Sequence, residues 1–434
     1  MRSFSIRSLG CKVNQYEGQQ IRQLLQDLGL AEVSSAKADL VILNCCSVTA
    51  TASAKCRQYL SRTRRINPTA LLVLCGCIPP VAERPKNSQH IRIIPSHQEL
   101  ASSLLQIVSR PTPALILGPA AGLPSPRVFS GHCKAFLKVQ DGCDAGCSYC
   151  VVPAQRPVIY SKPIDQVLAE AKVLIEAGHR EIVLTGVNLG AYGLQTTRHQ
   201  GHNPQLTELI CRLAELPGMS RLRLSSIDPS QVSRDLLAAM ARYPNVMPHL
   251  HLPLQSGSDR ILRLMGRRYQ RSMFIEAVQM TRELLDRPAI TTDVIIGFPG
   301  ETEEDFRQTI DLASQVVFAK IHVFPYSVRP GTAASELPNP VSPAVVKQRC
   351  RLLNELQREL GRQYRAQFIG HDAQVLVETQ GSRPTGLSER YFKVYIDQPC
   401  GPRLRCNQIV TARLIGHHAD GLMGVASPIG DNCS

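Results

Sequence analysis

The chain has 434 residues, of which 43% are apolar and 19% are charged, a composition that excludes an intrinsically disordered protein and predicts two or three domains. No run approaches the ~18 uncharged apolar residues of a membrane span, and the first residues lead into a strand pattern without a signal-peptide core, so we expect a cytoplasmic protein that does not enter a membrane. The 49 basic and 35 acidic residues give a net charge of +14, which favours a polyanionic partner.

The N-terminal residues 1–110 predict an open parallel α/β sheet. Apolar runs at residues 3–9, 39–43 and 70–74 are typical of strands, and helical patterns such as residues 16–28 follow them. Alternating strands and helices indicate a parallel sheet with helices on its faces.

A cysteine follows each of these three strands, at Cys11, Cys46 and Cys77. The carboxyl ends of parallel strands line one crevice, so the three thiols can converge despite their separation in sequence. Cys45 and Cys75 lie close by in the sequence and are alternative candidates for the same ligand positions. From the residues alone, buried thiols without a ligand role are the favoured interpretation, and convergence is the alternative.

Two predicted helices carry most of the excess basic charge, and we interpret them as RNA-facing, with a plain solvated helix face as the alternative. The first contains Lys55, Arg57, Arg62, Arg64 and Arg65, and the second contains Lys347, Arg349, Arg351, Arg358, Arg362 and Arg365.

A proline-rich linker at residues 111–128 separates the N-terminal domain from a second domain at residues 129–367, because its prolines cannot continue a helix or a strand. Six strands alternating with helices predict a (β/α)6 partial barrel, whose site is expected at the carboxyl ends of the strands. The predicted strands are residues 135–139, 181–184, 221–225, 249–252, 291–296 and 320–324.

Three cysteines, Cys143, Cys147 and Cys150, follow the first strand of this barrel. Three thiolates on one tight loop suit three corners of a [4Fe-4S] cluster and leave one iron for another ligand. A structural zinc site is the alternative, but it requires a fourth ligand that the neighbouring sequence lacks. Tyr149 is expected to lay its ring against a bound purine.

The C-terminal residues 368–434 show short alternating strands with turn residues between them, which predicts a small β-barrel of the kind that binds oligonucleotides. A β-domain with a purely structural role fits the same pattern.

The cysteine spacing CxxxCxxC resembles that of the radical S-adenosylmethionine (radical SAM) enzymes, and four further motifs are similar to those of the methylthiotransferases within that superfamily. The first and last of them resemble the branch that modifies N6-threonylcarbamoyladenosine in tRNA. The four motifs span residues 10–17 (GCKVNQYE), 251–258 (HLPLQSGS), 297–306 (GFPGETEEDF) and 324–332 (FPYSVRPGT).

This resemblance implies a tRNA methylthiotransferase that adds a methylthio group to carbon 2 of that nucleoside, next to the anticodon. It implies two [4Fe-4S] clusters, one held by Cys143, Cys147 and Cys150 and an auxiliary one held by Cys11, Cys46 and Cys77. It also implies that S-adenosylmethionine serves as methyl donor and radical source, and that a one-electron reductant such as flavodoxin or ferredoxin takes part. The C-terminal barrel would then be a TRAM-like module that binds tRNA.

The motif Thr185-Gly186-Val187-Asn188, at the end of the second barrel strand, matches the family's glycine motif and is expected to contact the cosubstrate. His249, His251 and Gln255 are spaced to share one face of the fourth strand, so Gln255 is also expected at the cofactor. The histidines fit either a substrate contact or a satisfied barrel core. We interpret Thr302 and Asp305 as a helix N-cap rather than as part of the site.

One segment departs from the family. Residues 151–162 carry Arg156 followed by Pro157, where the family usually has arginine and glycine, and proline fixes a backbone angle that glycine leaves free. Three alternatives therefore stay open: methylthiolation of isopentenyladenosine in tRNA, methylthiolation of a ribosomal protein aspartate, and a non-catalytic iron-sulfur protein that binds RNA.

Overall fold

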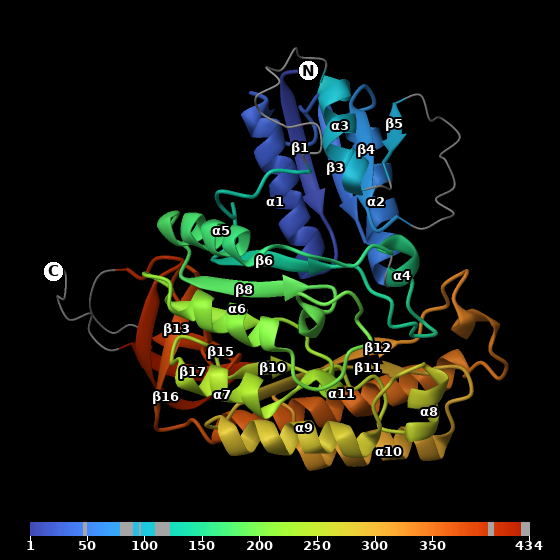
Figure 1. Ribbon diagram of the computed structural model, residues 1–434, viewed down its shortest axis with the longest axis vertical. Coiled ribbons are helices and arrows are strands. Elements are labelled where there is room, and N and C mark those ends of the chain that lie inside the picture. The colour runs from blue at the N-terminus through green and yellow to red at the C-terminus, as the bar shows by residue number, and fades with distance from the viewer. Residues whose placement is uncertain (47–49, 79–89, 95–96, 109–121, 398–402, 427–434) are drawn as a thin grey trace. The chain divides into compact units, whose positions relative to one another are not determined.

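The computed structural model describes residues 1–46, 50–78, 90–94, 97–108, 122–397 and 403–426. The chain forms two compact units. The first comprises Met1–Ser130 together with Val151–Pro157, and the second comprises Gly131–Cys150 together with Val158–Ser434 (Figure 1). Within the described part of the chain, no helix is long and apolar enough to cross a membrane.

The first unit is built on a parallel sheet with the strand order β2-β1-β3-β4-β5. Its elements are β1 (Ser3–Ser8), α1 (Lys12–Asp27), β2 (Ala31–Glu32), β3 (Leu40–Cys45), α2 (Ala50–Ile66), β4 (Leu71–Gly76), β5 (Ile91–Ile93) and α3 (His97–Val108). All six residues of β3 are buried, because the sheet is covered on both faces.

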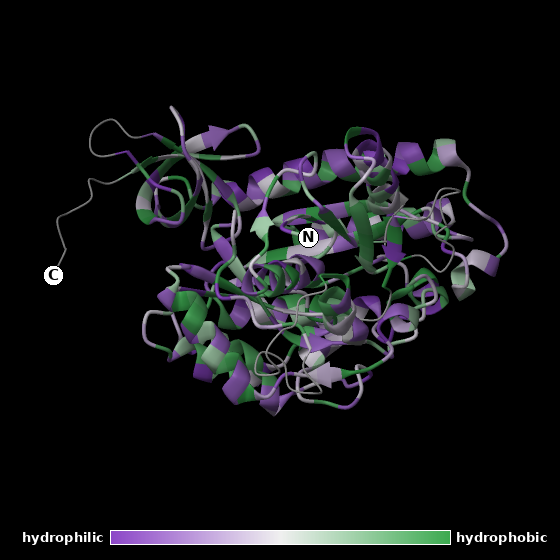
Figure 2. Ribbon diagram, turned by 90° about the horizontal axis from the view of Figure 1, so that it is seen from above, coloured by the Kyte–Doolittle hydropathy of each residue, from purple (hydrophilic) through white to green (hydrophobic). Residues whose placement is uncertain are grey.

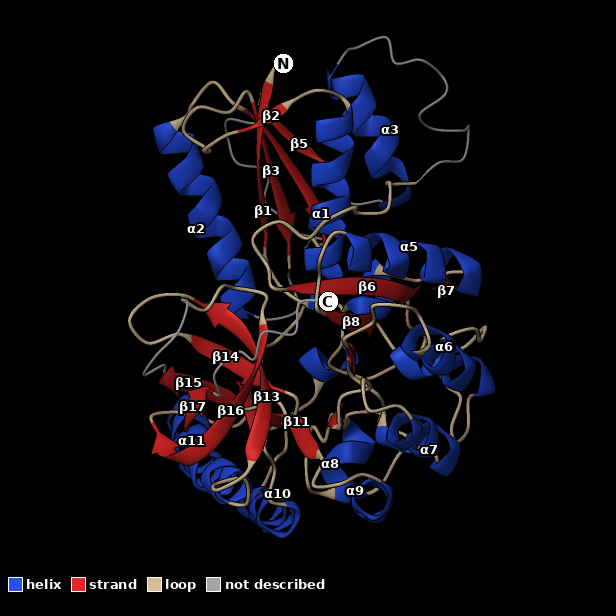
Figure 3. Cartoon of the chain, turned by 90° about the vertical axis from the view of Figure 1, so that its left-hand side faces the viewer, coloured by secondary structure: helices blue, strands red, loops and turns tan. Residues whose placement is uncertain are grey.

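Alternate residues of the central strands pack against different helices. Leu40 and Ile42 lie in the apolar cluster formed with α1 and α3, whereas Val41 and Leu43 lie in clusters formed with α2. Figure 3 shows α2 on one side of this sheet and α1 and α3 on the other. Because side chains alternate across a strand, neighbouring residues at a strand end point into different environments.

The second unit contains the predicted partial barrel. Its strands are β6 (Lys134–Asp141), β8 (Glu181–Gly186), β9 (Arg221–Leu224), β10 (His249–His251), β11 (Ala289–Ile296) and β12 (Lys320–Pro325), with a short β7 (Tyr160–Ser161) at the edge. They form two parallel groups, β6-β8-β9 and β10-β11-β12, which are joined by isolated bridges from Leu222 to Val246 and from Ser226 to His251.

Helices follow the barrel strands and are amphipathic, with hydrophilic and hydrophobic residues alternating along them (Figure 2). They are α4 (Val152–Gln155, in the first unit), α5 (Ile164–Glu176), α6 (Pro204–Ala214), α7 (Arg234–Arg242), α8 (Asp259–Leu264), α9 (Arg271–Leu284), α10 (Glu303–Val316) and α11 (Pro343–Ala366). Helix α10 begins with a capping box between Thr302 and Asp305, which confirms the predicted N-cap.

The C-terminal residues form a closed barrel with the order β13-β14-β15-β17-β16. Its strands are β13 (Asp372–Thr379), β14 (Thr385–Ser388), β15 (Lys393–Asp397), β16 (Ile409–His418) and β17 (Gly421–Ala426). The predicted fold class is thus confirmed: an open parallel sheet, a partial β/α barrel and a small β-barrel. The strands predicted from the sequence, at residues 373–377, 391–396, 408–414 and 421–425, leave out β14, because four residues that include a glycine do not form a recognisable strand pattern.

The small barrel is fastened to β9 by buried arginines. Arg221 donates to the carbonyl oxygens of Gln374 and Leu387 at 2.6 and 3.1 Å, and Arg223 donates to the Glu389 carbonyl at 3.2 Å. Both guanidinium groups also pair with the buried carboxylate of Glu181 on β8. One side of the small barrel is therefore occupied by the partial barrel.

Candidate iron-sulfur sites

The cysteine loop begins directly after β6, and glycines shape it. Gly142 and Gly146 have φ angles of +78° and +75°, in the left-handed region that glycine enters without steric cost. A Cβ atom on Gly142 would lie 2.0 Å from the carbonyl oxygen of Val158, so no larger residue fits there without a shift. The Gln140 side chain donates to the carbonyls of Asp141 and Gly142 at 2.8 and 2.9 Å and holds the turn.

Asp144, within the loop, anchors it to a neighbouring segment. Its carboxylate accepts hydrogen bonds from the Thr196 hydroxyl at 2.7 Å and from the Thr197 backbone at 2.8 Å. Burial alone would raise the pKa of Asp144, but the hydrogen bonds from Thr197 and Thr196 outweigh it and lower that pKa to about 2. The carboxylate is consequently charged at neutral pH.

Two of the three loop sulfurs lie beside hydrogen-bonding groups. The Cys143 Sγ lies 3.4 Å from both the Thr197 hydroxyl and the Ala145 amide nitrogen. Arg267 donates to the Cys147 Sγ at 3.3 Å, and Asp228 holds the same guanidinium at 2.6 Å. Donors of this kind stabilise thiolates, so the residues present fit a thiolate-ligated cluster.

The end of β8 lies beside this loop. Gly186 is paired with Gln140 of β6, and the Asn188 amide donates to the Gln140 side chain at 2.7 Å. The buried Oδ1 of Asn188 accepts no hydrogen bond from any residue that the structure describes. This orphaned acceptor suits a ligand with N–H groups, such as the amino group of the cosubstrate. Thr185, by contrast, bonds back to its own strand, at the Val183 carbonyl.

Tyr149 packs against an apolar cluster that contains Met265 and Phe298. Its expected contact with a purine stays a prediction.

His249 and His251 lie on one face of β10 as predicted, since each has a ring nitrogen 3.0 Å from the Thr291 hydroxyl, but the prediction is wrong for Gln255, because β10 ends at His251. Beyond it, Gln255 has a φ of +62° and bonds to β11 through its own backbone. A non-glycine residue in that conformation is uncommon and occurs often at functional sites. The role of Gln255 at the cofactor stays a prediction.

In the first unit, Asn14 of α1 lies among the three N-terminal cysteines. Its Oδ1 accepts from the thiols of Cys11 and Cys77, at 3.6 and 3.9 Å. Gly10 touches the third, since a Cβ atom on Gly10 would lie 2.7 Å from the Cys46 Sγ and 3.5 Å from the Asn14 amide nitrogen. The three thiols therefore gather at the carboxyl ends of β1, β3 and β4, a donor set that fits a cluster with thiolate ligands.

The neighbouring cysteines point elsewhere. Cys45 belongs to the apolar cluster beneath α2, and Cys75 belongs to the cluster beneath α1 and α3. Burial raises the pKa of the Cys75 thiol far above its usual range, which disfavours a thiolate there. Side-chain alternation at the end of β3 thus separates Cys45 from Cys46. Cys75 and Cys77 are separated by Gly76, the last residue of β4, whose φ of +81° breaks the extended backbone between them.

Arg156 lies in the first unit and pairs with Glu17 of α1. Both Nη atoms lie 2.8 Å from the Glu17 carboxylate, whose side chain is fully buried. Burial raises the pKa of the Cys77 thiol to about 11, and the charge of Arg156 opposes that rise. The sequence analysis missed Asn14 and Glu17. The signal was their spacing: Asn14 lies three residues after Cys11 and Glu17 lies three residues after Asn14, which places all three on one side of a helix.

The basic helices are only partly as predicted. Lys55, Arg57, Arg62 and Arg65 on α2 are exposed. Arg349 on α11, however, is buried and pairs with Glu301 at 2.9 Å, so its assignment to an RNA-facing surface is wrong. The sequence does not distinguish Arg349 from the exposed basic residues of the same helix, because its ion-pair partner Glu301 lies 48 positions away.

Two family models match the chain. One is described as the radical SAM superfamily and matches residues 137–313, and the other is described as the uncharacterized protein family UPF0004 and matches residues 3–93.

Similar proteins cover almost the whole chain. A threonylcarbamoyladenosine tRNA methylthiotransferase MtaB from Chlamydia pneumoniae is 37% identical over 97% of each chain. A tRNA-2-methylthio-N(6)-dimethylallyladenosine synthase from Zymomonas mobilis is 33% identical over 92% of each chain. Among solved structures, the radical S-adenosylmethionine methyltransferase TsrM from Kitasatospora setae has a TM-score of 0.55 at 15% identity and covers 77% of this chain and 75% of its own, a likeness of fold.

Proposed function

The chain belongs to the radical SAM methylthiotransferase family, and we propose that it adds a methylthio group to carbon 2 of N6-threonylcarbamoyladenosine in tRNA, next to the anticodon. The observation that carries this proposal is the pair of cysteine triads, one at the carboxyl ends of β1, β3 and β4 and the other on the loop after β6, each with hydrogen-bonding groups beside two of its sulfurs. The names of the relatives support tRNA as the substrate.

The family implies a [4Fe-4S] cluster and S-adenosylmethionine, and we propose that Cys143, Cys147 and Cys150 hold that cluster. Bound together, the two supply a radical that removes hydrogen from an unreactive carbon. Arg267 and Thr197 hold the sulfurs of Cys147 and Cys143 in place. The buried Oδ1 of Asn188 is positioned to accept from the amino group of the cosubstrate.

We further propose that Cys11, Cys46 and Cys77 hold an auxiliary [4Fe-4S] cluster. Cys11 is the N-cap residue of α1, and the exposed amide groups at a helix N-terminus favour negative charge. Asn14 orients two of the three thiols. The same proposal includes a cytoplasmic location and a flavodoxin or ferredoxin as electron donor. It also includes the domain bounds 1–110, 111–128 (the linker), 129–367 and 368–434. Residues 427–434 and most of the linker lie outside the described residues.

Substitutions of single cysteines test the division between the two triads. In protein reconstituted anaerobically and reduced with dithionite, Cys147→Ala should abolish the release of 5′-deoxyadenosine from S-adenosylmethionine. Cys46→Ala should retain that release but stop methylthiolation, because its thiol belongs to the other triad. Cys45→Ala is the matched control, since its thiol lies in the apolar cluster beneath α2. Equal losses in Cys46→Ala and Cys147→Ala would contradict the division.

The nucleoside itself is tested in cells. Deleting the gene should remove 2-methylthio-N6-threonylcarbamoyladenosine from digested tRNA, and loss of the methylthio derivative of isopentenyladenosine instead would assign the chain to the other tRNA branch. An unchanged pool of both would exclude the tRNA proposals. No 5′-deoxyadenosine from fully reconstituted protein would support the non-catalytic alternative.

A further inference from the structure

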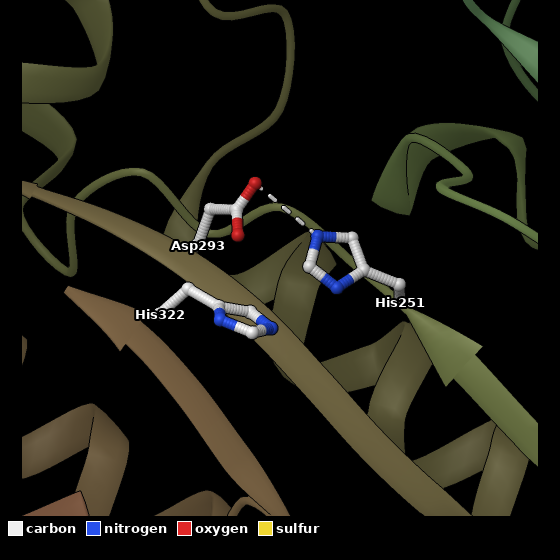
Figure 4. Close-up of side chains that lie close together, drawn as sticks. All are labelled: His251, Asp293 and His322. Carbon is white, nitrogen blue, oxygen red and sulfur yellow. Dashed lines mark ion pairs between the residues drawn. The ribbon is translucent and has the colours of Figure 1, made fainter. Parts of the chain in front are cut away.

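We propose that His251, Asp293 and His322 form a binding site for one divalent transition-metal ion, distinct from the cysteine triads. The three residues come from the neighbouring strands β10, β11 and β12, and Figure 4 shows their side chains gathered on one face of these strands. Asp293 and His322 are direct partners across β11 and β12. Because strand neighbours are held by backbone bonds, the three ligands need no loop to bring them together.

The spacing suits one ion. His251 Nε2 lies 3.3 Å from Asp293 Oδ2, and one ligand atom from each of the three residues lies within 4.8 Å of the other two. Two donors about 2.1 Å from a tetrahedral ion lie about 3.4 Å apart, so the His251–Asp293 spacing matches two ligands of the same metal. Within the described part of the chain, no other group of three histidine, cysteine or acidic residues meets this spacing.

The surroundings of His251 orient it as a ligand. Its Nδ1 lies 3.0 Å from the Thr291 hydroxyl, so its Nε2 is the nitrogen directed at Asp293. An imidazole whose second nitrogen is held by a hydrogen bond has its ring orientation and tautomer set for metal binding. The side chains of His251 and Asp293 are 15% and 32% exposed, which gives an ion a route to the site.

The donor set selects the class of ion. Two neutral imidazoles and one carboxylate carry a net negative charge and suit Zn²⁺, Fe²⁺ or Mn²⁺, whereas Mg²⁺ and Ca²⁺ prefer ligand sets made of oxygen. His322 supplies a third donor within 4.8 Å of the ligand atoms of His251 and Asp293. Three protein ligands leave further coordination positions for water or another oxygen donor.

Titration with Mn²⁺, followed by the electron paramagnetic resonance signal of the free ion, tests the site. The full chain is first loaded with iron and sulfide, so that the cysteines are occupied, and kept oxidised. We expect one Mn²⁺ to bind per chain and an excess of Zn²⁺ to displace it, in line with the usual order of affinities. Asp293→Asn and His322→Gln should each abolish that binding.

Two further variants make the test specific. Thr291→Val keeps all three ligands but removes the hydrogen bond to His251, and it should weaken Mn²⁺ binding about 10-fold to 100-fold. His371→Gln, at an exposed histidine before β13, should bind Mn²⁺ as the wild type does. Iron and sulfide contents equal to the wild type show that each variant is folded. No Mn²⁺ or Zn²⁺ bound by the wild type, or equal binding by Asp293→Asn and His322→Gln, would overturn the proposal.

Discussion

Single residues outside the cysteine motifs decide how the thiols are held. Asn14 accepts from two thiols of the first unit, and Arg267 donates to one thiol of the second. The contacts from Asn14 to Cys77 and from Arg267 to Cys147 join residues 63 and 120 positions apart, so the spacing of the cysteines does not indicate them.

Gly142 occupies a position in the cysteine loop that has no room for a side chain. Gly142→Ala should prevent reconstitution of the loop cluster, because its Cβ atom would collide with the Val158 carbonyl oxygen. Gly131→Ala is the matched control: Gly131 has nearly the same φ, +76°, but nothing lies within 4 Å of an added Cβ. The control should lose only about 1 kcal/mol of stability from the left-handed backbone. Iron content after reconstitution measures the difference, and equal iron in both variants would contradict it.

Arg156 neutralises the buried carboxylate of Glu17 in the first unit. Arg156→Ala leaves the buried Glu17 carboxylate without this ion pair and should lower the free energy of unfolding of the first unit by about 3 kcal/mol. Arg307→Ala, which removes an exposed pair on α10, should leave the urea midpoint unchanged. Urea denaturation followed by tyrosine fluorescence compares the two, since the chain has no tryptophan. A wild-type midpoint for Arg156→Ala would show that the pair is dispensable.

At the scale of elements, side-chain alternation along a strand sorts chemically identical residues into different roles. In β3 and β4 it directs Cys45 and Cys75 into apolar clusters, and in the barrel it places Thr291 and Asp293 on the face opposite to the buried Thr292 and Val294. The same strands therefore provide both the core and a candidate site.

Glu181 on β8 gives a prediction for the attachment of the small barrel. Burial would raise its pKa, but the charges of Arg223, Lys134 and Arg221 and the hydrogen bond from Arg223 together outweigh burial and lower the pKa to about 2. Because this lies below the ~4.3 of an unfolded glutamate, Glu181 stabilises the fold above about pH 4, and that contribution is lost as the pH falls towards 2.

Glu181→Gln should therefore lower the urea midpoint of the second unit at pH 7 and flatten its decline between about pH 4 and pH 2. Glu304→Gln, at an exposed carboxylate of α10, is the control and should follow the wild type. Parallel pH profiles for Glu181→Gln and the wild type would contradict the assignment.

At the scale of the whole molecule, the net charge of +14 is spread over separate surfaces. Exposed basic residues line α2, and a cavity of about 660 Å³ beside the small barrel is lined by Arg180, Arg403 and Arg405. All of these groups suit phosphate contacts. On α11, Lys347, Arg351, Arg358 and Arg362 are exposed as well, whereas Arg349 is buried in an ion pair.

A tRNA-binding measurement tests this distribution of charge. Replacing both Arg403 and Arg405 with serine should weaken tRNA binding and reduce the dependence of log Kd on log salt by about 2, if each arginine contacts one phosphate. Lys172→Ser, at an exposed basic residue of α5, is the control and should bind tRNA as the wild type does. Unchanged salt dependence in the double variant would remove this cavity from the tRNA surface.

The sequence by itself determined the three-part fold class, the strands that precede each cysteine, and the family, because these depend on local periodicity and on motifs that are contiguous in the chain. Only the tertiary structure brought Asn14 to two thiols, paired Arg156 with Glu17, buried Arg349 against Glu301, and gathered His251, Asp293 and His322 on one face. Those contacts join residues up to 139 positions apart. Local patterns carry no information about such pairs, which arise when strands take their order in a sheet and helices pack on it.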